Sequence, residues 1–405
     1  MTSIAARWLM LPVLFAALFL HGCGSLPVAP QAEPVPTPQP RPEALGTTAP
    51  TKEAAAPAIE PSQQRITVAA VGDIMLGSDF PDDALPPHDG KEMLTAAAPL
   101  LRSADIALGN LEGVLLDGGK PFKQCQNNGR CYVFRSPSRY AQLLAESGFD
   151  VLSLANNHAR DFGEAGRSAS MTHLDAVGIR HSGRVGDVAS WSVAGRRVAF
   201  IAFAPYDGSH DLREIAQMKR LVAQLASDHD IVIVSFHGGS EGSDAVNVPF
   251  ASEYYHGEDR GDVAHFARAA VEAGADLVIG HGPHVPRGIE LYQERLIAYS
   301  LGNFATYQGV NVAGRTGLAP LVTVTLDGEG RFISGDIHSF RQQRPGGPQP
   351  DPSVAAARLM AQVTASNFAD SPLKIDEGGT LLRIDGALAV GKPGSTGKIP
   401  PARVE

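Results

Sequence analysis

The sequence predicts an α/β fold built around a sheet with helical crossovers, and three observations support it. Short, mainly apolar runs such as residues 231–236 and 275–279, the second of them bounded by Gly, are typical of strands buried on both faces, although a buried helix has the same pattern. Amphipathic stretches such as residues 212–227 place apolar side chains on one face of a helix. Carboxylate, amide or imidazole side chains next to Gly directly follow the strands. In such sheets ligands bind beyond the carboxyl ends of the strands, so these side chains should meet at one edge.

Composition narrows the class of protein. The 405 residues, 43% of them hydrophobic, can bury the core of one large domain or two modest ones. The formal net charge of -9 argues against a nucleic-acid partner, which would need a basic face, and predicts no electrostatic attraction to anionic lipid.

Residues 1–23 read as a bacterial export signal. Arg7 supplies the positive charge, residues 8–20 form an apolar stretch too short for a comfortable membrane span, and Leu20-His21-Gly22-Cys23 resembles a lipoprotein box. This pattern implies cleavage before Cys23 and lipid attachment to it, which anchors a soluble domain to a membrane. The alternative is an ordinary secretory signal with a chance Cys. Gly24 favours the outer membrane, facing the periplasm, if the cell has one.

Residues 24–64 are a linker rich in Pro and Ala, with almost no large apolar side chains. Such a segment cannot bury enough surface to offset its ordering entropy, so we expect it to be disordered. It would hold the following domain away from the lipid.

The main domain is predicted at residues 65–345. It opens with residues 66–71, which are rich in β-branched residues and end at Gly72-Asp73. Further strands are predicted at residues 104–108, 149–154, 231–236, 275–279 and 296–300, a hairpin at 193–203, and helices at 137–146, 212–227 and 263–273.

The C-terminal third contains a strong turn signal, Asp327-Gly328-Glu329-Gly330, between strands at 318–326 and 331–340. A break at 345–352 precedes an extension, residues 346–388, with a helix at 353–365 and a strand at 380–384. Residues 389–405 form a Gly- and Pro-rich tail that we expect to lack fixed structure.

Polar groups that can bind metal or transfer protons follow successive strands. They are Asp73, Asn110 with Glu112, Asn157 with His158, His237, and His281 with His284. Residues far apart in sequence would converge at one sheet edge, and neutral imidazole is a common metal ligand. The alternative for the histidines is that they merely cap neighbouring carbonyls. For His173, His181, His210, His229, His256, His265 and His338 we expect surface or loop positions.

Several other polar pairs allow two interpretations. The Asp82-Asp83 pair is predicted to be a solvated loop rather than a catalytic dyad. Tyr254 and Tyr255 would form a packed loop or a rim on which substrate stacks. Cys125 and Cys131 close a small loop in an exported chain, which favours a disulfide over a metal site, near the mouth of the site.

Six motifs, A-V-G-D-I-M-L-G, A-L-G-N-L-E-G, L-S-L-A-N-N-H-A-R-D-F-G, V-S-F-H-G-G-S-E, V-I-G-H-G-P-H-V and A-Y-S-L-G-N-F, occur in order across residues 65–341. This series resembles the CapA/PgsA family of capsule-synthesis proteins, which is associated with poly-γ-glutamate and related to calcineurin-like metallophosphoesterases. The resemblance implies a four-layer α-β-β-α sandwich of two mixed sheets, metallophosphatase-like, with metal ions at one edge.

When the functional residues of the family are carried over position by position, the resemblance implies both metal ligands and a catalytic residue. The metal ligands would be Asp73, Glu112, Asn157, His237, His281 and His284, and His158 would be a catalytic proton donor. Residues that support the ligands or contact substrate would be Asn110, Asp161, Glu241 and Asn303.

This chain departs from the related patterns at several positions. Met75 replaces a His of the phosphoesterases, and Glu112 stands where a shorter Asp would bridge two ions, which makes one ion more certain than two. Gly238 and Gly282 stand where bulkier residues are common in the capsule family, and Arg287 where Gln is usual, so the shape of the substrate site is expected to differ.

These features leave three functional hypotheses. The favoured one is a lipid-anchored, metal-dependent hydrolase-like component of capsule or exopolymer synthesis, using Mn, Zn or Fe as one or two ions. Its partners would be the membrane through Cys23, capsule synthase or export subunits, and a polymer or phosphoester substrate. The alternatives are an envelope phosphoesterase unrelated to capsule and a non-catalytic polymer-binding subunit.

Overall fold

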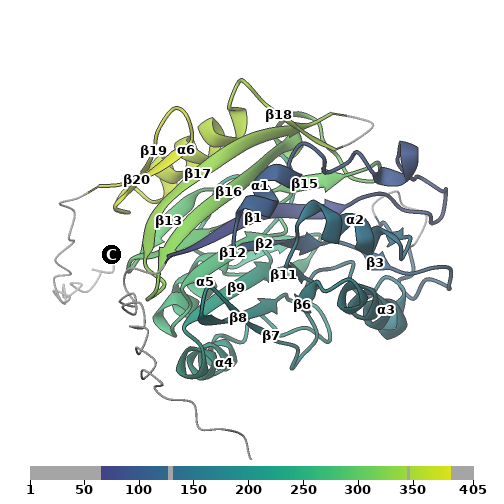
Figure 1. Ribbon diagram of the computed structural model, residues 1–405, viewed down its shortest axis with the longest axis horizontal. Helices are drawn as coiled ribbons and strands as arrows, with labels where there is room; N and C mark the ends of the chain where they lie inside the picture. Colours follow the sequence, from purple (N-terminus) through teal and green to yellow (C-terminus); the bar gives the residue numbers. More distant parts are fainter. Residues whose placement is uncertain (1–64, 126–130, 344–346, 385–405) are drawn as a thin grey trace, which may run out of the picture. The chain divides into compact units, whose positions relative to one another are not determined.

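The computed structural model describes residues 65–125, 131–343 and 347–384 (Figure 1). The predicted signal with Cys23, the linker and the C-terminal tail lie outside these residues. No helix within the described ranges is long and apolar enough to span a bilayer.

Two mixed sheets form the centre of the domain. The larger is 10-stranded in the order β19-β20-β17-β16-β1-β2-β5-β6, with β15 beside β1 and β18 beside β17. Its strands are β1 (Arg65–Met75), β2 (Ile106–Leu111), β5 (Val151–Ser153), β6 (Arg180–Ser182), β15 (Asn303–Thr306), β16 (Leu318–Asp327), β17 (Phe332–Gln342), β18 (Pro348–Pro350), β19 (Leu373–Ile375) and β20 (Thr380–Arg383). The strands β1, β2, β5 and β6 run parallel, while β16 and β17 continue the sheet antiparallel.

The second sheet is 6-stranded, in the order β13-β14-β12-β9-β8-β7. Its strands are β7 (Ala189–Val193), β8 (Arg196–Phe203), β9 (Ile231–His237), β12 (Leu277–His281), β13 (Ile289–Tyr292) and β14 (Arg295–Ala298). Two small two-stranded sheets are separate from the main sheets: β3 (Val114–Leu115) with β4 (Arg135–Ser136), and β10 (Glu253–Tyr255) with β11 (Glu258–Gly261).

Helices cover the outer face of each sheet, which gives four layers. Along β1, Val68 and Ala70 belong to the core between the sheets, whereas Ala69 and Val71 pack towards the outer helices, as the two-residue period of a strand requires. On β8, Phe200 and Ile201 divide in the same way. The helices α1 (Ala98–Ser103), α2 (Tyr140–Ser147) and α3 (Gly163–Ala176) accompany the larger sheet, and α4 (Ile215–Asp228) and α5 (Val263–Glu272) the smaller one (Figure 1). The predicted α-β-β-α sandwich is therefore confirmed.

The C-terminal extension joins this core. Helix α6 (Ala355–Asn367) places Ala357 and Met360 in the cluster between the sheets, and β20 pairs with β17. The predicted break at residues 345–352 was wrong in part, because β18 pairs there with β17. The hairpin predicted at residues 193–203 begins earlier, at Ala189, and α3 was missed altogether.

Register places the ends of the central strands at one edge. Asp73 lies opposite Asn110 on β2 and Asn303 on β15, and His281 on β12 lies opposite His237 on β9. The approach beside Asp73 is close, since a Cβ on Gly72 would lie 1.9 Å from the carbonyl oxygen of Gly302. Only glycine permits this contact, which brings Asp73 next to the loop that follows β14.

Candidate metal centre

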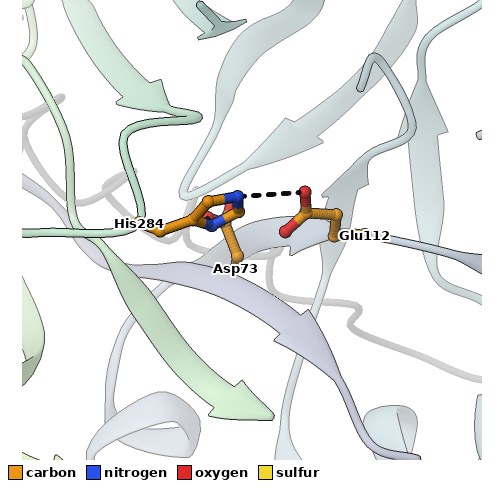
Figure 2. A group of neighbouring side chains, drawn as sticks. All are labelled: Asp73, Glu112 and His284. Atoms are coloured by element: carbon orange, nitrogen blue, oxygen red, sulfur yellow. Dashed lines mark hydrogen bonds and ion pairs between the residues drawn. The ribbon is translucent and has the colours of Figure 1, made fainter. Parts of the chain in front are cut away.

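The strand ends bring most of the predicted ligands into one buried cluster. One ligand atom each of Asp73, Glu112 and His284 lies within 4.8 Å of the others, and Figure 2 shows these three side chains facing one another. His281 Nδ1 lies 3.5 Å from Asp73 Oδ1, and His237 Nε2 lies 4.0 Å from Glu112 Oε1. These five side chains come from four segments that are distant in sequence, as the strand-end pattern predicted.

Asparagine side chains fix the orientation of Asp73. Asn110 Nδ2 donates to Asp73 Oδ1 at 2.8 Å, and Asn156 Nδ2 donates to Asn110 Oδ1 at 3.0 Å. Asn156 also accepts from the backbone N–H of His158 at 3.0 Å. Asn156 was not predicted as a site residue, although its position directly before Asn157 in the motif was the available signal.

His284 is held between two acceptors. Its Nδ1 lies 3.1 Å from Asp73 Oδ2 and 3.0 Å from Asn303 Oδ1, which favours a proton on Nδ1. Its Nε2 is left facing Glu112 and Glu241, each at 3.7 Å. The backbone of His284 adopts a positive φ of 60°, an uncommon conformation for a non-glycine residue and one often found at functional sites.

Several buried ligand-type atoms have no hydrogen-bond partner among the described residues. They are both carboxylate oxygens of Glu112, Asn157 Oδ1, His237 Nε2 and both ring nitrogens of His281. Leaving a buried polar atom unpaired is costly, so several of them in the cluster and at the cavity beside it call for a ligand. Carboxylate, amide and imidazole donors together fit a divalent metal ion.

Burial and mutual charge shift the pKa values of this cluster. Burial raises the pKa of Glu112 to about 8, and the nearby carboxylates of Asp73 and Glu241 act in the same direction. Burial disfavours the charged form of His284, but Glu112 and Asp73 outweigh it and raise the pKa of His284 to about 10. Burial also opposes ionisation of Asp73, yet His281 and His284 hold its pKa below the usual range.

We expect metal affinity to rise with pH. Without metal, Glu112, with a pKa of about 8, and His284, with a pKa of about 10, are protonated at neutral pH. Metal binding needs both groups deprotonated, so it must release protons, and the dissociation constant should fall about tenfold or more per pH unit below pH 8. Calorimetric Mn²⁺ titrations in buffers of different ionisation enthalpy measure the protons released. A pH-independent dissociation constant would contradict the expectation.

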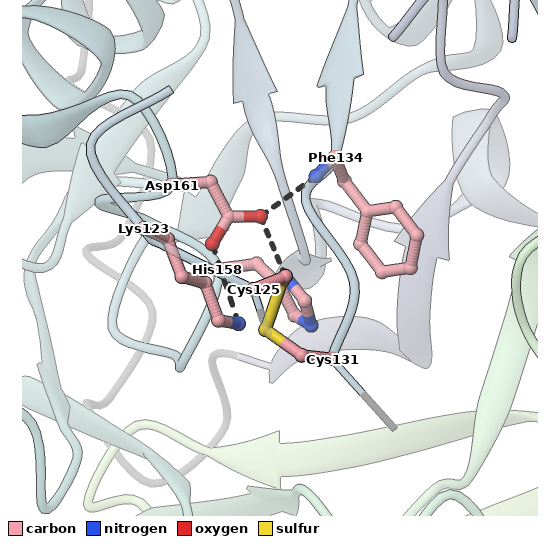
Figure 3. Close-up of a disulfide and its surroundings, with 6 residues drawn as sticks. All are labelled: Lys123, Cys125, Cys131, Phe134, His158 and Asp161. Atoms are coloured by element: carbon pink, nitrogen blue, oxygen red, sulfur yellow. Dashed lines mark hydrogen bonds and ion pairs between the residues drawn. A yellow bond between two sulfur atoms is a disulfide. The ribbon is translucent and has the colours of Figure 1, made fainter. Parts of the chain in front are cut away.

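His158 forms a second feature of the site, beside the metal cluster. Its Nδ1 lies 2.7 Å from Asp161 Oδ2, which also accepts from the backbone N–H of Phe134 at 2.7 Å (Figure 3). Lys123 Nζ lies 3.4 Å from Asp161 Oδ1. The ring centre of Phe134 lies 4.4 Å from that of the imidazole, with the two planes tilted by 35°. Burial lowers the pKa of His158 although Asp161 opposes this.

The predicted disulfide Cys125–Cys131 is present in the structure. Figure 3 shows it beside His158 and Asp161, on the segment that carries Lys123 and Phe134. The disulfide thus braces the two sides of the loop whose backbone and side chains contact Asp161. This agrees with the expectation that it shapes the mouth of the site.

A cavity of about 680 Å³ opens over the cluster. Glu112, Asn157, His158, Glu241 and His284 line it together with Lys123, Tyr132, Phe134, Tyr206, Tyr255, His256 and Arg260. Of the predicted tyrosine pair, Tyr255 lines the cavity while Tyr254 is 61% exposed. Tyr206 and Arg260 were not predicted as site residues, and His256 lies exposed in the turn between β10 and β11 as predicted, at the edge of the cavity.

His181 departs from the prediction of a surface or loop position, whereas His210 is buried but lies in the loop after β8, as predicted. His181 is buried on β6, with Nδ1 2.9 Å from Asp187 Oδ2, and His210 is buried with Nε2 accepting from the backbone N–H of Gly186. Neither lines the cavity over the metal cluster. Asp82 and Asp83 are exposed, as expected of a solvated loop.

Arg287 does not shape the substrate site directly. Its side chain is fully buried and pairs with Glu253 through Nη1 at 2.8 Å and Nη2 at 2.7 Å. Glu253 in turn accepts from the backbone N–H of Ser240 at 3.0 Å, close to Glu241. Arg287 therefore supports the loop after β9, so that an effect on the shape of the substrate site would act through this loop rather than through contact with substrate.

Gly238 and Gly282 are required by close backbone contact. A Cβ on Gly282, at φ +114°, would lie 2.7 Å from the carbonyl oxygen of Gly238. A Cβ on Gly238 would lie 2.8 Å from the carbonyl oxygen of Arg260. The two loops that carry His237 and His284 can pack this closely only with glycine at these positions.

We expect Arg287→Gln to destabilise the fold. The change leaves the carboxylate of Glu253 buried without its partner, which typically costs about 3–5 kcal/mol. Urea unfolding followed by circular dichroism measures the loss. The matched control is the double variant Arg287→Gln with Glu253→Gln. It removes the buried, unpaired carboxylate of Glu253 and should recover part of the lost stability. Equal stability of Arg287→Gln and wild type would contradict the structural role.

The sequence is similar to a family of bacterial proteins and to individual members of known name. Residues 67–308 match the family described as bacterial capsule synthesis protein PGA_cap. The capsule biosynthesis protein CapA of Bacillus anthracis is 28% identical over 278 residues, which is 64% of this chain and 64% of that protein. The PGA biosynthesis protein CapA of Bacillus subtilis (strain 168) is 28% identical over 339 residues, 80% of this chain and 84% of that protein.

Similarity to solved structures is weaker. A 5'-nucleotidase precursor from Thermus thermophilus aligns with a TM-score of 0.37 at 14% identity, over 76% of this chain and 59% of that one. The NAD nucleotidase of Haemophilus influenzae aligns with a TM-score of 0.38 at 12% identity, over 75% of this chain and 56% of that one.

Proposed function

Because the chain belongs to the bacterial capsule synthesis protein PGA_cap family, we propose that it is a metal-dependent hydrolase-like component of capsule or exopolymer biosynthesis or export. The observation that carries the hydrolase-like part is the set of buried, unpartnered ligand atoms of Glu112, Asn157, His237 and His281 at the metal cluster and the cavity over it. A purely structural core would not leave so many polar atoms unpaired. The capsule part is supported by the family and by the names of the Bacillus relatives.

The residues of the site would have separate roles in binding metal and in orienting the ligands. Asp73, Glu112, Asn157, His237, His281 and His284 would hold one or two ions of Mn, Zn or Fe. A bound divalent ion polarises a phosphoryl or carbonyl oxygen and increases the acidity of water. Asn110 and Asn303 orient Asp73 and His284, and Glu241 faces His284 from the cavity.

His158 would donate a proton to the leaving group. Asp161 holds its Nδ1 at 2.7 Å, which fixes the ring and leaves Nε2 for the substrate. Burial lowers the pKa of His158, and an anionic substrate would raise it again by favouring the charged imidazole. The pair thus provides an acid that becomes protonated when substrate is present.

The substrate would be a phosphoester or an amide-linked anionic polymer of the poly-γ-glutamate type. The protein would be exported and anchored through lipidated Cys23 to the envelope, at the periplasmic face of the outer membrane if the cell has one. Capsule synthase or export subunits would be its partners. The export signal and lipoprotein box of the sequence support this location.

A metal and activity assay tests the proposal. Purified protein, supplied with Mn²⁺ or Zn²⁺, should retain stoichiometric metal by elemental analysis. It should also hydrolyse bis(p-nitrophenyl) phosphate, p-nitrophenyl phosphate or γ-glutamyl p-nitroanilide. Activity on small phosphoesters without any capsule defect in a deletion strain would instead favour an envelope phosphoesterase. A chain that holds no metal would favour a non-catalytic polymer-binding subunit.

A further inference from the structure

Arg260 is a buried cation at the wall of the metal-site cavity. It is 4% exposed, and its guanidinium carbon lies 5.3 Å from the ring centre of Tyr206 and 5.4 Å from that of Tyr255. Nη2 pairs with Glu241 at 2.9 Å and Nε with Glu258 at 3.1 Å. Two rings and two carboxylates therefore hold the guanidinium plane in a fixed orientation.

One edge of this guanidinium is unused. Arg260 Nη1 is buried and has no hydrogen-bond partner in the described part of the chain. A buried guanidinium normally satisfies its N–H donors, because an unpaired donor away from water is costly. The unused donor belongs to a residue that lines the cavity, so a ligand in that cavity is its natural partner.

Tyr206, whose ring packs against the Arg260 guanidinium, offers a second unused donor. Its hydroxyl is buried without a hydrogen-bond partner among the described residues, and the side chain lines the same cavity. Its ring centre lies 6.1 Å from that of His237, one of the candidate metal ligands. The phenol and the guanidinium thus stand together at the edge of the metal cluster.

The connection to the metal cluster runs through Glu241. This carboxylate pairs with Arg260 through Oε1 and lies 3.7 Å from His284 Nε2 through Oε2. Since Glu241 and Glu258 balance the charge of Arg260, a ligand gains mainly from directed hydrogen bonds rather than from net positive charge. Such donors suit an oxyanion, which can accept from both at once.

We propose that Arg260 and Tyr206 form a donor pair that binds an oxyanion of the substrate, a phosphoryl oxygen or a carboxylate, beside the metal cluster. This inference rests on the proposed function and specifies it, because it assigns the group that positions the substrate over His158 and the metal ligands. A phosphoester and an acidic polymer both carry such an oxyanion, and the experiment distinguishes the two.

Calorimetric titration of the purified full-length protein, loaded with Mn²⁺, tests the pair with inorganic phosphate and with glutarate as probes. Tyr206→Phe removes the hydroxyl and keeps the ring against Arg260. We expect it to weaken binding of at least one probe by about tenfold to a hundredfold, as for one hydrogen bond to a charged group. Arg260→Lys should weaken the same probe. Loss confined to phosphate indicates a phosphoryl group, and loss confined to glutarate indicates a carboxylate.

Matched variants outside the cavity serve as controls. Tyr140→Phe removes another buried hydroxyl, and Arg268→Gln alters an arginine that also lies over two rings, Phe250 and Tyr292, and pairs with Glu290. Both controls should bind the probes as wild type does. Metal content and melting temperature of Tyr206→Phe should equal those of wild type, which separates a lost contact from a misfolded site.

The inference is overturned if wild type binds neither probe, or if Tyr206→Phe and wild type bind both with equal dissociation constants. Absence of metal in wild type contradicts the proposed function instead. In that case the same titrations on the metal-free chain test the donor pair. A weaker affinity of Tyr206→Phe for phosphate or glutarate supports the pair, and an affinity equal to that of wild type overturns it.

Discussion

Replacing His158 with Gln is expected to lower hydrolytic turnover by about 10²–10⁴-fold while metal content stays unchanged. The imidazole lines the cavity and is held by Asp161 at 2.7 Å, but it supplies no ligand atom to the cluster around Asp73. Gln keeps a similar size and a hydrogen-bonding end, so the loop with Phe134 should remain in place. What is lost is the group that can carry a proton to the leaving oxygen.

The measurement is the steady-state rate with bis(p-nitrophenyl) phosphate at saturating Mn²⁺, beside elemental analysis. His173→Gln, a histidine on α3 away from the cavity, is the matched control and should keep wild-type rates. Asp161→Asn should lower turnover less than His158→Gln, because it disturbs the orientation of the imidazole and leaves the ring present. Loss of metal in His158→Gln would mean that this residue belongs to the metal cluster, against the role assigned to it.

The convergence of ligands could be predicted because strand ends carry a local signal. Asp73, His237 and His281 each close an apolar run next to Gly, and parallel strands end at a common edge. The register found between β9 and β12 follows the same rule and sets His237 opposite His281. The four-layer arrangement came from the family resemblance instead, because apolar runs do not tell how strands divide between two sheets.

Other parts of the site carry no local signal. Arg260 lies on β11 of a small two-stranded sheet, and Tyr206 lies in the loop after β8, so their meeting depends wholly on tertiary packing. The same holds for Arg287, whose partner Glu253 is 34 residues away. Helix α3 escaped prediction because its sequence, G-E-A-G-R-S-A-S-M-T-H-L-D-A, is rich in small and polar residues and buries few large apolar ones.

Asp73→Ala is expected to abolish metal binding. Asp73 is fully buried, and it joins His281, His284 and Asn110 in one network. When Asp73 is removed, the cluster loses a ligand, His284 loses the carboxylate that orients it, and His281 loses a negative charge 3.5 Å away. Elemental analysis of the protein supplied with Mn²⁺ and Zn²⁺ should find stoichiometric metal in wild type and none in this variant.

The supporting residues should respond less steeply. Asn110→Ala removes a hydrogen bond to Asp73 rather than a ligand, and changes of this kind typically cost about 10–100-fold in metal affinity. Asp82→Ala provides the control, because this acid is exposed in a loop near the same strand and should retain full metal content. The order of the three variants is the decisive result. The loss of metal affinity should be largest for Asp73→Ala, intermediate for Asn110→Ala and absent for Asp82→Ala. Full metal retention by Asp73→Ala, in protein folded by circular dichroism, would contradict a centre built on β1 and would leave the unpaired atoms of Glu112 and His281 to be explained by some other ligand.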